Sequence, residues 1–217
     1  MTPVSPPVAC FNLSAAMSYV ASRFLIGPDV DILFFTNAST QLSALARRNS
    51  IIWSLNTTAS LNLNTWYHIA FVRRGSACAL YYNGALAGSA TSSATFDSAS
   101  FPLYIGIERT AAIAFLGYIS NVRIIKGTAA YTGPFIPPSS PVAITANTSV
   151  LVNGTTGSLI DWTTSNDLET VGDAKLSVQT PYAGTYYSNY FDGTGDYLSA
   201  PSNAAFAYGT GNFTIEC

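Results

Sequence analysis

Apolar and polar positions alternate most clearly at residues 66–73, WYHIAFVR. Because strand side chains point alternately to two faces, this period of two predicts a β-strand, and apolar residues on both faces predict that both are covered. A polar turn at residues 73–76 precedes a second apolar run at residues 79–82. Asn83-Gly84 then favours a tight turn into a third strand, because both residues tolerate positive φ. The residues expected in the core of this meander are Trp66, Ile69, Phe71 and Leu80.

Short apolar runs bounded by Gly, Pro, Asn and Ser predict strands along most of the remaining chain. We expect residues 168–176 to form a short hairpin of their own. No stretch has a convincing long helical pattern, so the fold class expected is an all-β sandwich. The other predicted strands cover residues 19–26, 31–36, 41–48, 51–55, 103–107, 115–125, 149–152, 188–198 and 213–217.

The meander also carries a family resemblance. NTWYHIAFVR at residues 64–73 and LYYNG at residues 80–84 resemble the signature of laminin-G-like domains, which are concanavalin-A-like lectin/glucanase jelly rolls. LYIG at residues 103–106 and GYISNVRI at residues 117–124 are similar to that family's last strands. KGTAAYTG at residues 126–133 resembles a tail common in repeats of phage and environmental surface proteins. The resemblance implies a jelly-roll sandwich of two antiparallel sheets, a fold that hosts lectins, adhesion modules, hydrolases and inert spacers.

The order of the strands is unusual for this family. YFDGTGDYL at residues 190–198 looks like the opening strands of the jelly roll, yet it comes after the closing ones. We expect a proline-rich lead-in at residues 1–9, a laminin-G-like body at residues 10–141, and a linker with opening strands at residues 142–217. Those strands complete their own domain in cis, insert into a neighbouring subunit in trans, or belong to a further repeat. We favour the trans arrangement.

Composition narrows the classes of function. Charged residues make up 9% of the chain and the net charge is −2, against about 25% charged residues in a typical soluble domain. A nucleic-acid partner is not expected, because no basic patch is available. No run approaches the ~18 apolar residues of a membrane span. Cys10, Cys78 and Cys217 are too widely spaced for a disulfide framework or a zinc site.

The low charge also bears on where the protein acts. Ser, Thr, Asn and Gly give it a polar but uncharged surface, typical of extracellular or particle-bound β-proteins. Residues 1–26 show no secretory signal. We therefore expect a mature or partial extracellular protein, or one that reaches its site without secretion, as a virion component does.

Catalytic chemistry is poorly supported. Glycosidases of this fold place carboxylates close together around one sugar ring, but the chain has three glutamates, Glu108, Glu169 and Glu216. The one Asp-X-Glu spacing, Asp167 to Glu169, is expected to be a solvated turn. His68 is the single histidine, and its place within a strand predicts a core or cleft-lining residue rather than a catalytic base. We expect no enzyme activity.

Two weaker binding sites are candidates. Asp192 and Asp196 flank a Gly-rich turn where carboxylates and carbonyls suit calcium; the favoured alternative is a structural turn in which the Asp side chains cap backbone N–H groups. Tyr186, Tyr187 and Tyr190 form an aromatic-polar cluster suited to a glycan. No other cofactor is expected.

The leading hypothesis for function is a non-enzymatic structural and adhesion module of a virion, such as a phage tail or capsid surface, or of another extracellular assembly. Its partners would be copies of itself or other structural proteins of that assembly. The alternatives are a glycan-binding lectin domain, with or without calcium, and an extracellular filament subunit assembled by strand exchange.

Overall fold

The structure, a computed structural model, describes the backbone of residues 11–13, 20–25, 31–36, 41–48, 50–96, 102–107, 114–155 and 157–217. Side chains are described for residues 55, 61–96, 102–107, 114–155 and 157–217. This part of the chain consists of antiparallel strands, their turns and one 3-10 turn, η1 (Ala204–Phe206). The all-β prediction is therefore confirmed. Within the described residues no helix is long and apolar enough to span a membrane.

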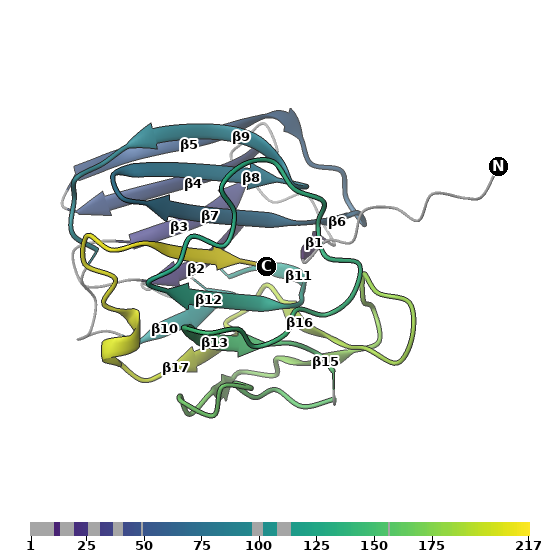
Figure 1. Cartoon of the computed structure of the whole chain (residues 1–217). Coiled ribbons are helices and arrows are strands. Elements are labelled where there is room, and N and C mark those ends of the chain that lie inside the picture. The colour runs from purple at the N-terminus through teal and green to yellow at the C-terminus, as the bar shows by residue number, and fades with distance from the viewer. Residues whose placement is uncertain are drawn as a thin grey trace.

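One large sheet has six strands in the order β13-β12-β18-β7-β8-β9 (Figure 1). The last strand of the chain, β18, lies inside this sheet and pairs with β12 on one side and β7 on the other. All four of its residues are buried, because the main core covers one face of the strand and residues 128–131 cover the other. The bounds are β7 (Ile69–Arg74), β8 (Ala77–Tyr82), β9 (Ala85–Thr91), β12 (Val122–Lys126), β13 (Thr148–Val152) and β18 (Phe213–Glu216).

Three further groups of strands complete the fold, in the orders β15-β16-β11-β1-β6, β10-β17-β14 and β2-β3-β4-β5. The first of these is called here the five-stranded sheet. Its strands are β1 (Phe11–Leu13), β6 (Trp66–Tyr67), β11 (Leu116–Ile119), β15 (Lys175–Ser177) and β16 (Ser188–Asp192). The others are β2 (Val20–Leu25), β3 (Asp31–Thr36), β4 (Gln41–Arg48), β5 (Ser50–Ser60), β10 (Leu103–Ile105), β14 (Glu169–Val171) and β17 (Tyr197–Ala200).

The main core lies between these layers. Alternation along β7 sends Ile69 and Phe71 into it, where they are almost fully buried. The β5 strand closes over the same core, since a Cβ added at Gly88 of β9 would lie 3.2 Å from Leu55 Cδ2. Phe191 and Ile215 bring the C-terminal strands into this cluster. The sheets are thus held together by one shared apolar interior.

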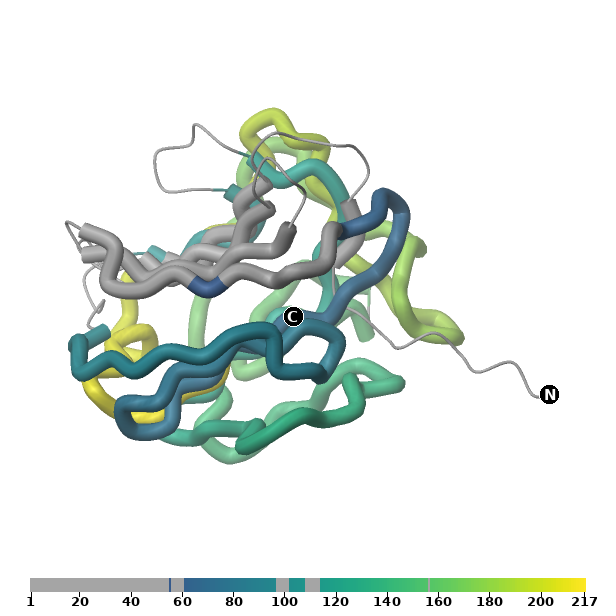
Figure 2. The backbone as a smooth tube through the Cα atoms, turned by 90° about the horizontal axis from the view of Figure 1, so that it is seen from above, coloured from purple at the N-terminus to yellow at the C-terminus, as the bar shows by residue number. Residues whose placement is uncertain are grey.

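The opposite face of the six-stranded sheet is covered by residues 127–147, called here the covering segment. Seen from above, it runs along the side of β7–β9 that faces away from the rest of the molecule (Figure 2). Ala70, Val72 and Tyr81 form a second apolar cluster beneath it. The segment is tied to the Asn83-Gly84 turn, because the Phe135 N–H donates to the Gly84 carbonyl at 2.9 Å. Both turn residues have positive φ, as predicted.

Several local predictions are corrected. Trp66 is not enclosed by the core as predicted, because β6 joins the five-stranded sheet; its indole is half-buried and packs against the main core from outside. The predicted strand at 115–125 is two strands in different sheets, since Asn121 at φ 58° breaks it. Residues 168–176 do not form a hairpin, because β14 pairs with β17 and β15 with β16. Arg73, expected in a polar turn, is buried and donates to the carbonyls of Gly75, Ser92 and Ala94.

Candidate functional site

Three aromatic side chains line up across the outer surface of the five-stranded sheet. Trp66 and Tyr118 both lie opposite Asn12 in the strand register, and Tyr118 lies opposite Tyr190. Their strand neighbours Tyr67, Ile119 and Phe191 point the other way and are buried. Because side chains alternate between faces, the three rings share the outward face. We call Trp66, Tyr118 and Tyr190 the outer aromatic row.

The rings of the row are close but not coplanar. The Trp66 and Tyr118 centroids lie 6.3 Å apart across β1, with their planes at 45°. Tyr118 and Tyr190 are 5.1 Å apart at 46°. At the far end, the Lys175 ammonium lies 5.4 Å from the centroid of the Tyr190 ring and 3.8 Å from an Asp173 carboxylate oxygen. The row therefore forms a twisted aromatic surface that is closed at one end by a paired charge.

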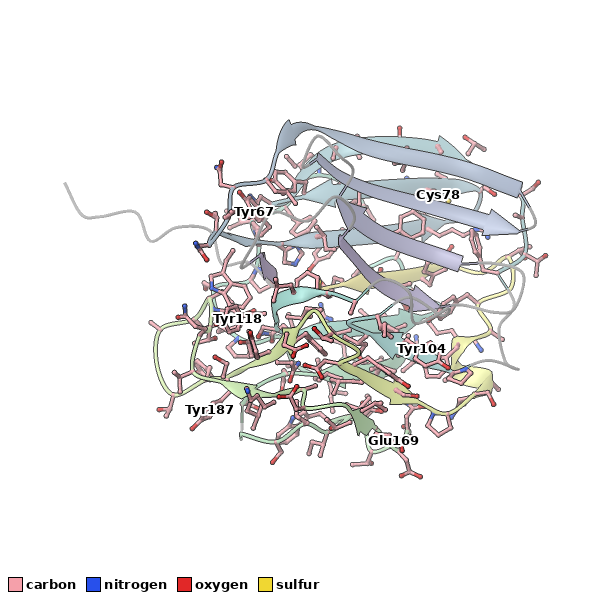
Figure 3. All side chains as sticks on the ribbon, turned by 180° about the vertical axis from the view of Figure 1, so that it is seen from behind. Tyr67, Cys78, Tyr104, Tyr118, Glu169 and Tyr187 are labelled. Carbon is pink, nitrogen blue, oxygen red and sulfur yellow. The ribbon has the colours of Figure 1, made fainter. Side chains whose placement is uncertain are left out.

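The predicted cluster of Tyr186, Tyr187 and Tyr190 is divided between two places. Only Tyr190 belongs to the row. The Tyr187 backbone pairs with Gly154 instead, and its label lies below that of Tyr118 in the view from behind (Figure 3). Tyr186 packs edge-on against Tyr182, with centroids 6.0 Å apart. The row was missed from sequence because its members come from three distant parts of the chain.

The predicted calcium turn contains a third acid. Asp173, Asp192 and Asp196 offer oxygens that all lie within 4.8 Å of one another, and carboxylates are the ligands that calcium prefers. However, the buried Asp196 carboxylate accepts the Asp173 N–H at 2.8 Å and the Asp192 N–H at 3.1 Å. Asp192 accepts the Thr194 N–H at 2.6 Å. These bonds match the structural turn, and calcium binding stays a prediction.

A buried ionic network lies beneath the covering segment. The Glu216 carboxylate receives the Arg123 guanidinium, whose Nε donates to Oε1 at 2.6 Å. The Tyr131 hydroxyl donates to Oε2 at 2.6 Å, and His68 Nε2 lies 3.4 Å from Oε2. Burial favours a raised pKa, but the His68 hydrogen bond and the Arg123 charge outweigh it and hold the Glu216 pKa below its usual value. His68 is thus a buried residue, as its strand position predicts.

The other described carboxylates are either bound by protein donors or exposed. Buried Asp161 accepts four hydrogen bonds, from Leu151, Thr163 and Asn166. Asp167 and Glu169 are exposed, and Glu108 lies outside the described residues. The described buried carboxylates therefore hold strands and loops in place.

The sequence of the chain was compared with models of known protein families. Residues 12–130 match the laminin G-type model of the concanavalin A-like lectin/glucanases superfamily. The chain belongs to this superfamily. The match spans more than half of the sequence and includes the meander, two strands of the aromatic row and the buried Arg123. Neither the curated proteins nor the solved structures compared with the chain gave a match.

Proposed function

We propose that the protein is a non-enzymatic structural and adhesion module of an extracellular assembly, such as a virion surface. The observation that carries this proposal is the use of the buried carboxylates. Glu216, Asp161 and Asp196 each give their oxygens to protein donors. A glycosidase needs two carboxyl groups free to meet one sugar. The low charge of the chain supports a surface-exposed setting.

Hydrolysis assays test the absence of enzymatic activity. The purified protein is incubated with laminarin, agar and carrageenan, and reducing ends are measured. We expect no release above a buffer control. Release that Glu108→Gln or Glu169→Gln abolishes would contradict the proposal.

Glycan binding is a second candidate function, favoured by the outer aromatic row. Partly exposed rings on a sheet surface provide apolar contact without a catalytic pair. A glycan array separates a lectin, which gives signal, from a spacer, which does not. Repeating the array with EDTA tests whether the Asp192 and Asp196 turn makes binding calcium-dependent.

Self-assembly by exchange of β18 between copies is the remaining alternative. This strand makes its pairings with β7 and β12 within its own chain, and a β18 from a second copy would offer the same donors and acceptors. Exchange of β18 between copies would then build a head-to-tail filament. Negative-stain microscopy of concentrated protein distinguishes filaments from monomers.

A further inference from the structure

The polar atoms of the outer aromatic row are available to a ligand. In the part of the chain with described side chains, no hydrogen bond engages the Trp66 indole N–H or the hydroxyls of Tyr118 and Tyr190. These groups contrast with the Tyr131 hydroxyl, which donates to Glu216. Buried or half-buried Trp and Tyr usually place these groups against a partner. The row thus offers three ring faces and three unused donors on one surface.

The spacing and tilt of the rings restrict the shape of that ligand. Steps of 6.3 and 5.1 Å between centroids are comparable with the advance of one sugar ring along a glycan chain. Neighbouring ring planes inclined to each other by about 45° cannot all lie flat on one crystalline face. A single chain that twists along its axis can present successive C–H faces to them, because the electron-rich ring faces attract those hydrogens.

The charges around the row restrict its chemistry. Lys175, the cation at its end, is opposed by Asp173. Asp192 shares a strand with Tyr190 and lies two residues away, on the same outward face. A carboxylated or sulfated glycan would meet these two acids, whereas hydroxyl groups can donate to them. The local charge therefore complements an uncharged ligand.

We propose that the outer aromatic row binds one chain of a neutral polysaccharide, which lies across β16, β11 and β6. This inference rests on the glycan-binding candidate function above and names its site and ligand class. Trp66, Tyr118 and Tyr190 stack on sugar rings, and their donors hydrogen-bond hydroxyl groups.

Affinity electrophoresis of the full chain tests the proposal. The protein is run in native gels that contain a neutral polysaccharide (laminarin, xyloglucan, galactomannan or hydroxyethylcellulose) or an acidic one (alginate or carrageenan). We expect retardation by at least one neutral polymer. Tyr118→Ala and Tyr190→Ala should each weaken it about tenfold, equivalent to about 1.4 kcal/mol. Trp66→Phe should abolish the ligand-induced change in tryptophan fluorescence.

Tyr104→Ala is the matched control. Tyr104 is also half-buried and packs on another tyrosine, Tyr197, at 5.6 Å, but it lies at the opposite end of the molecule from Tyr118 (Figure 3). The Tyr104→Ala variant should bind the polysaccharide as tightly as the parent protein. Thermal melts verify that each variant is folded, and Tyr118→Phe, which keeps the ring, serves if Tyr118→Ala does not fold.

The outcomes separate the site from the function. If both Tyr118→Ala and Tyr190→Ala bind as tightly as the parent protein, the outer aromatic row is not the binding site, but the protein still binds a glycan. Binding to acidic polymers alone overturns the neutral class. If the parent binds no polymer of either kind, the candidate function and the inference both fail.

Discussion

Both large sheets carry aromatic side chains on their outer faces, but within the described residues only the face of the six-stranded sheet is covered by another segment. On the six-stranded sheet, Tyr81 packs beneath the covering segment, whose Tyr131 and Phe135 rings stack at 3.5 Å and 6°. On the five-stranded sheet, Trp66 and Tyr118 stay half-buried, with their polar atoms unengaged by the described side chains. The same residue type thus contributes to stability on one face and remains available for contact on the other.

One face is covered and the other is not because the chain takes different paths after β12 and after β16. β12 leads into residues 127–147, which fold back over their own sheet and bring Tyr131 to Glu216. β16 instead turns at Gly193 directly into β17, which joins another group of strands. An aromatic residue on the outer face of a sheet therefore indicates a binding surface only when the chain that follows does not cover it.

Deletion of residues 190–217 is expected to have the largest effect. It removes β18 from the middle of the six-stranded sheet and most of β16 from the five-stranded one, exposing edges and apolar surface on both. We expect an insoluble or unfolded product, measured by solubility, size-exclusion chromatography and circular dichroism. A soluble monomer as stable as the full chain would rule out completion by these strands, in cis or in trans.

Removing the Glu216 carboxylate, which lies below the covering segment, is expected to cause the next largest loss of stability. Glu216→Ala leaves Arg123 buried without its charged partner and should cost about 3–5 kcal/mol in a urea melt. Glu169→Ala is the control, because that glutamate is exposed on β14 and should change stability by less than about 0.5 kcal/mol. Equal losses in the two variants would contradict the structural role of the network.

The same network predicts a dependence on pH. The pKa of Glu216 is lower in the folded protein than its ordinary value, so the network stabilises the fold above the unfolded-state pKa. That stability is lost as the pH falls through the folded-state pKa. Melts between pH 7 and pH 3 should show a decline that is shallower in Glu216→Ala.

Leu80→Ala measures how much one side chain of the main core contributes to the free energy of unfolding. Leu80 is fully buried in the main core, so the loss of its side chain should cost about 2–5 kcal/mol. The measurement is a denaturant melt of the folded chain. A loss below roughly 0.5 kcal/mol, the size of an ordinary surface change, would mean that the strand assignment is wrong.

The smallest effects test the comparison directly. Phe135→Ala opens the covered face, where its ring contacts His68, Tyr81 and Tyr131, and should cost about 1–3 kcal/mol because these contacts are partly buried. Tyr118→Ala should cost less than about 1 kcal/mol, the scale of one cross-strand pair. If Tyr118→Ala is the more damaging of the two in matched melts, the row serves packing rather than contact.

Much of the fold could be read from local pattern. The period of two at residues 66–73 predicted burial on both faces of β7, and Asn83-Gly84 predicted the turn with positive φ. β3 matches its predicted bounds at Asp31–Thr36. Where the local pattern failed, the missing information was the neighbouring strand. Trp66 alternates like a core residue, but pairing with β1 leaves it half-buried at the margin of the core.

The amino-acid sequence by itself determined the strands, their turns, the family and the scarcity of free charge. Only the tertiary structure decided which strands became neighbours. It placed Trp66, Tyr118 and Tyr190 in one row, added Asp173 to Asp196, and joined Arg123 to Glu216 across 93 positions. The physical reason is that strand periodicity is a local property of the backbone and side chains. Strand order depends instead on long-range pairing, which is chosen by the burial of the whole apolar interior.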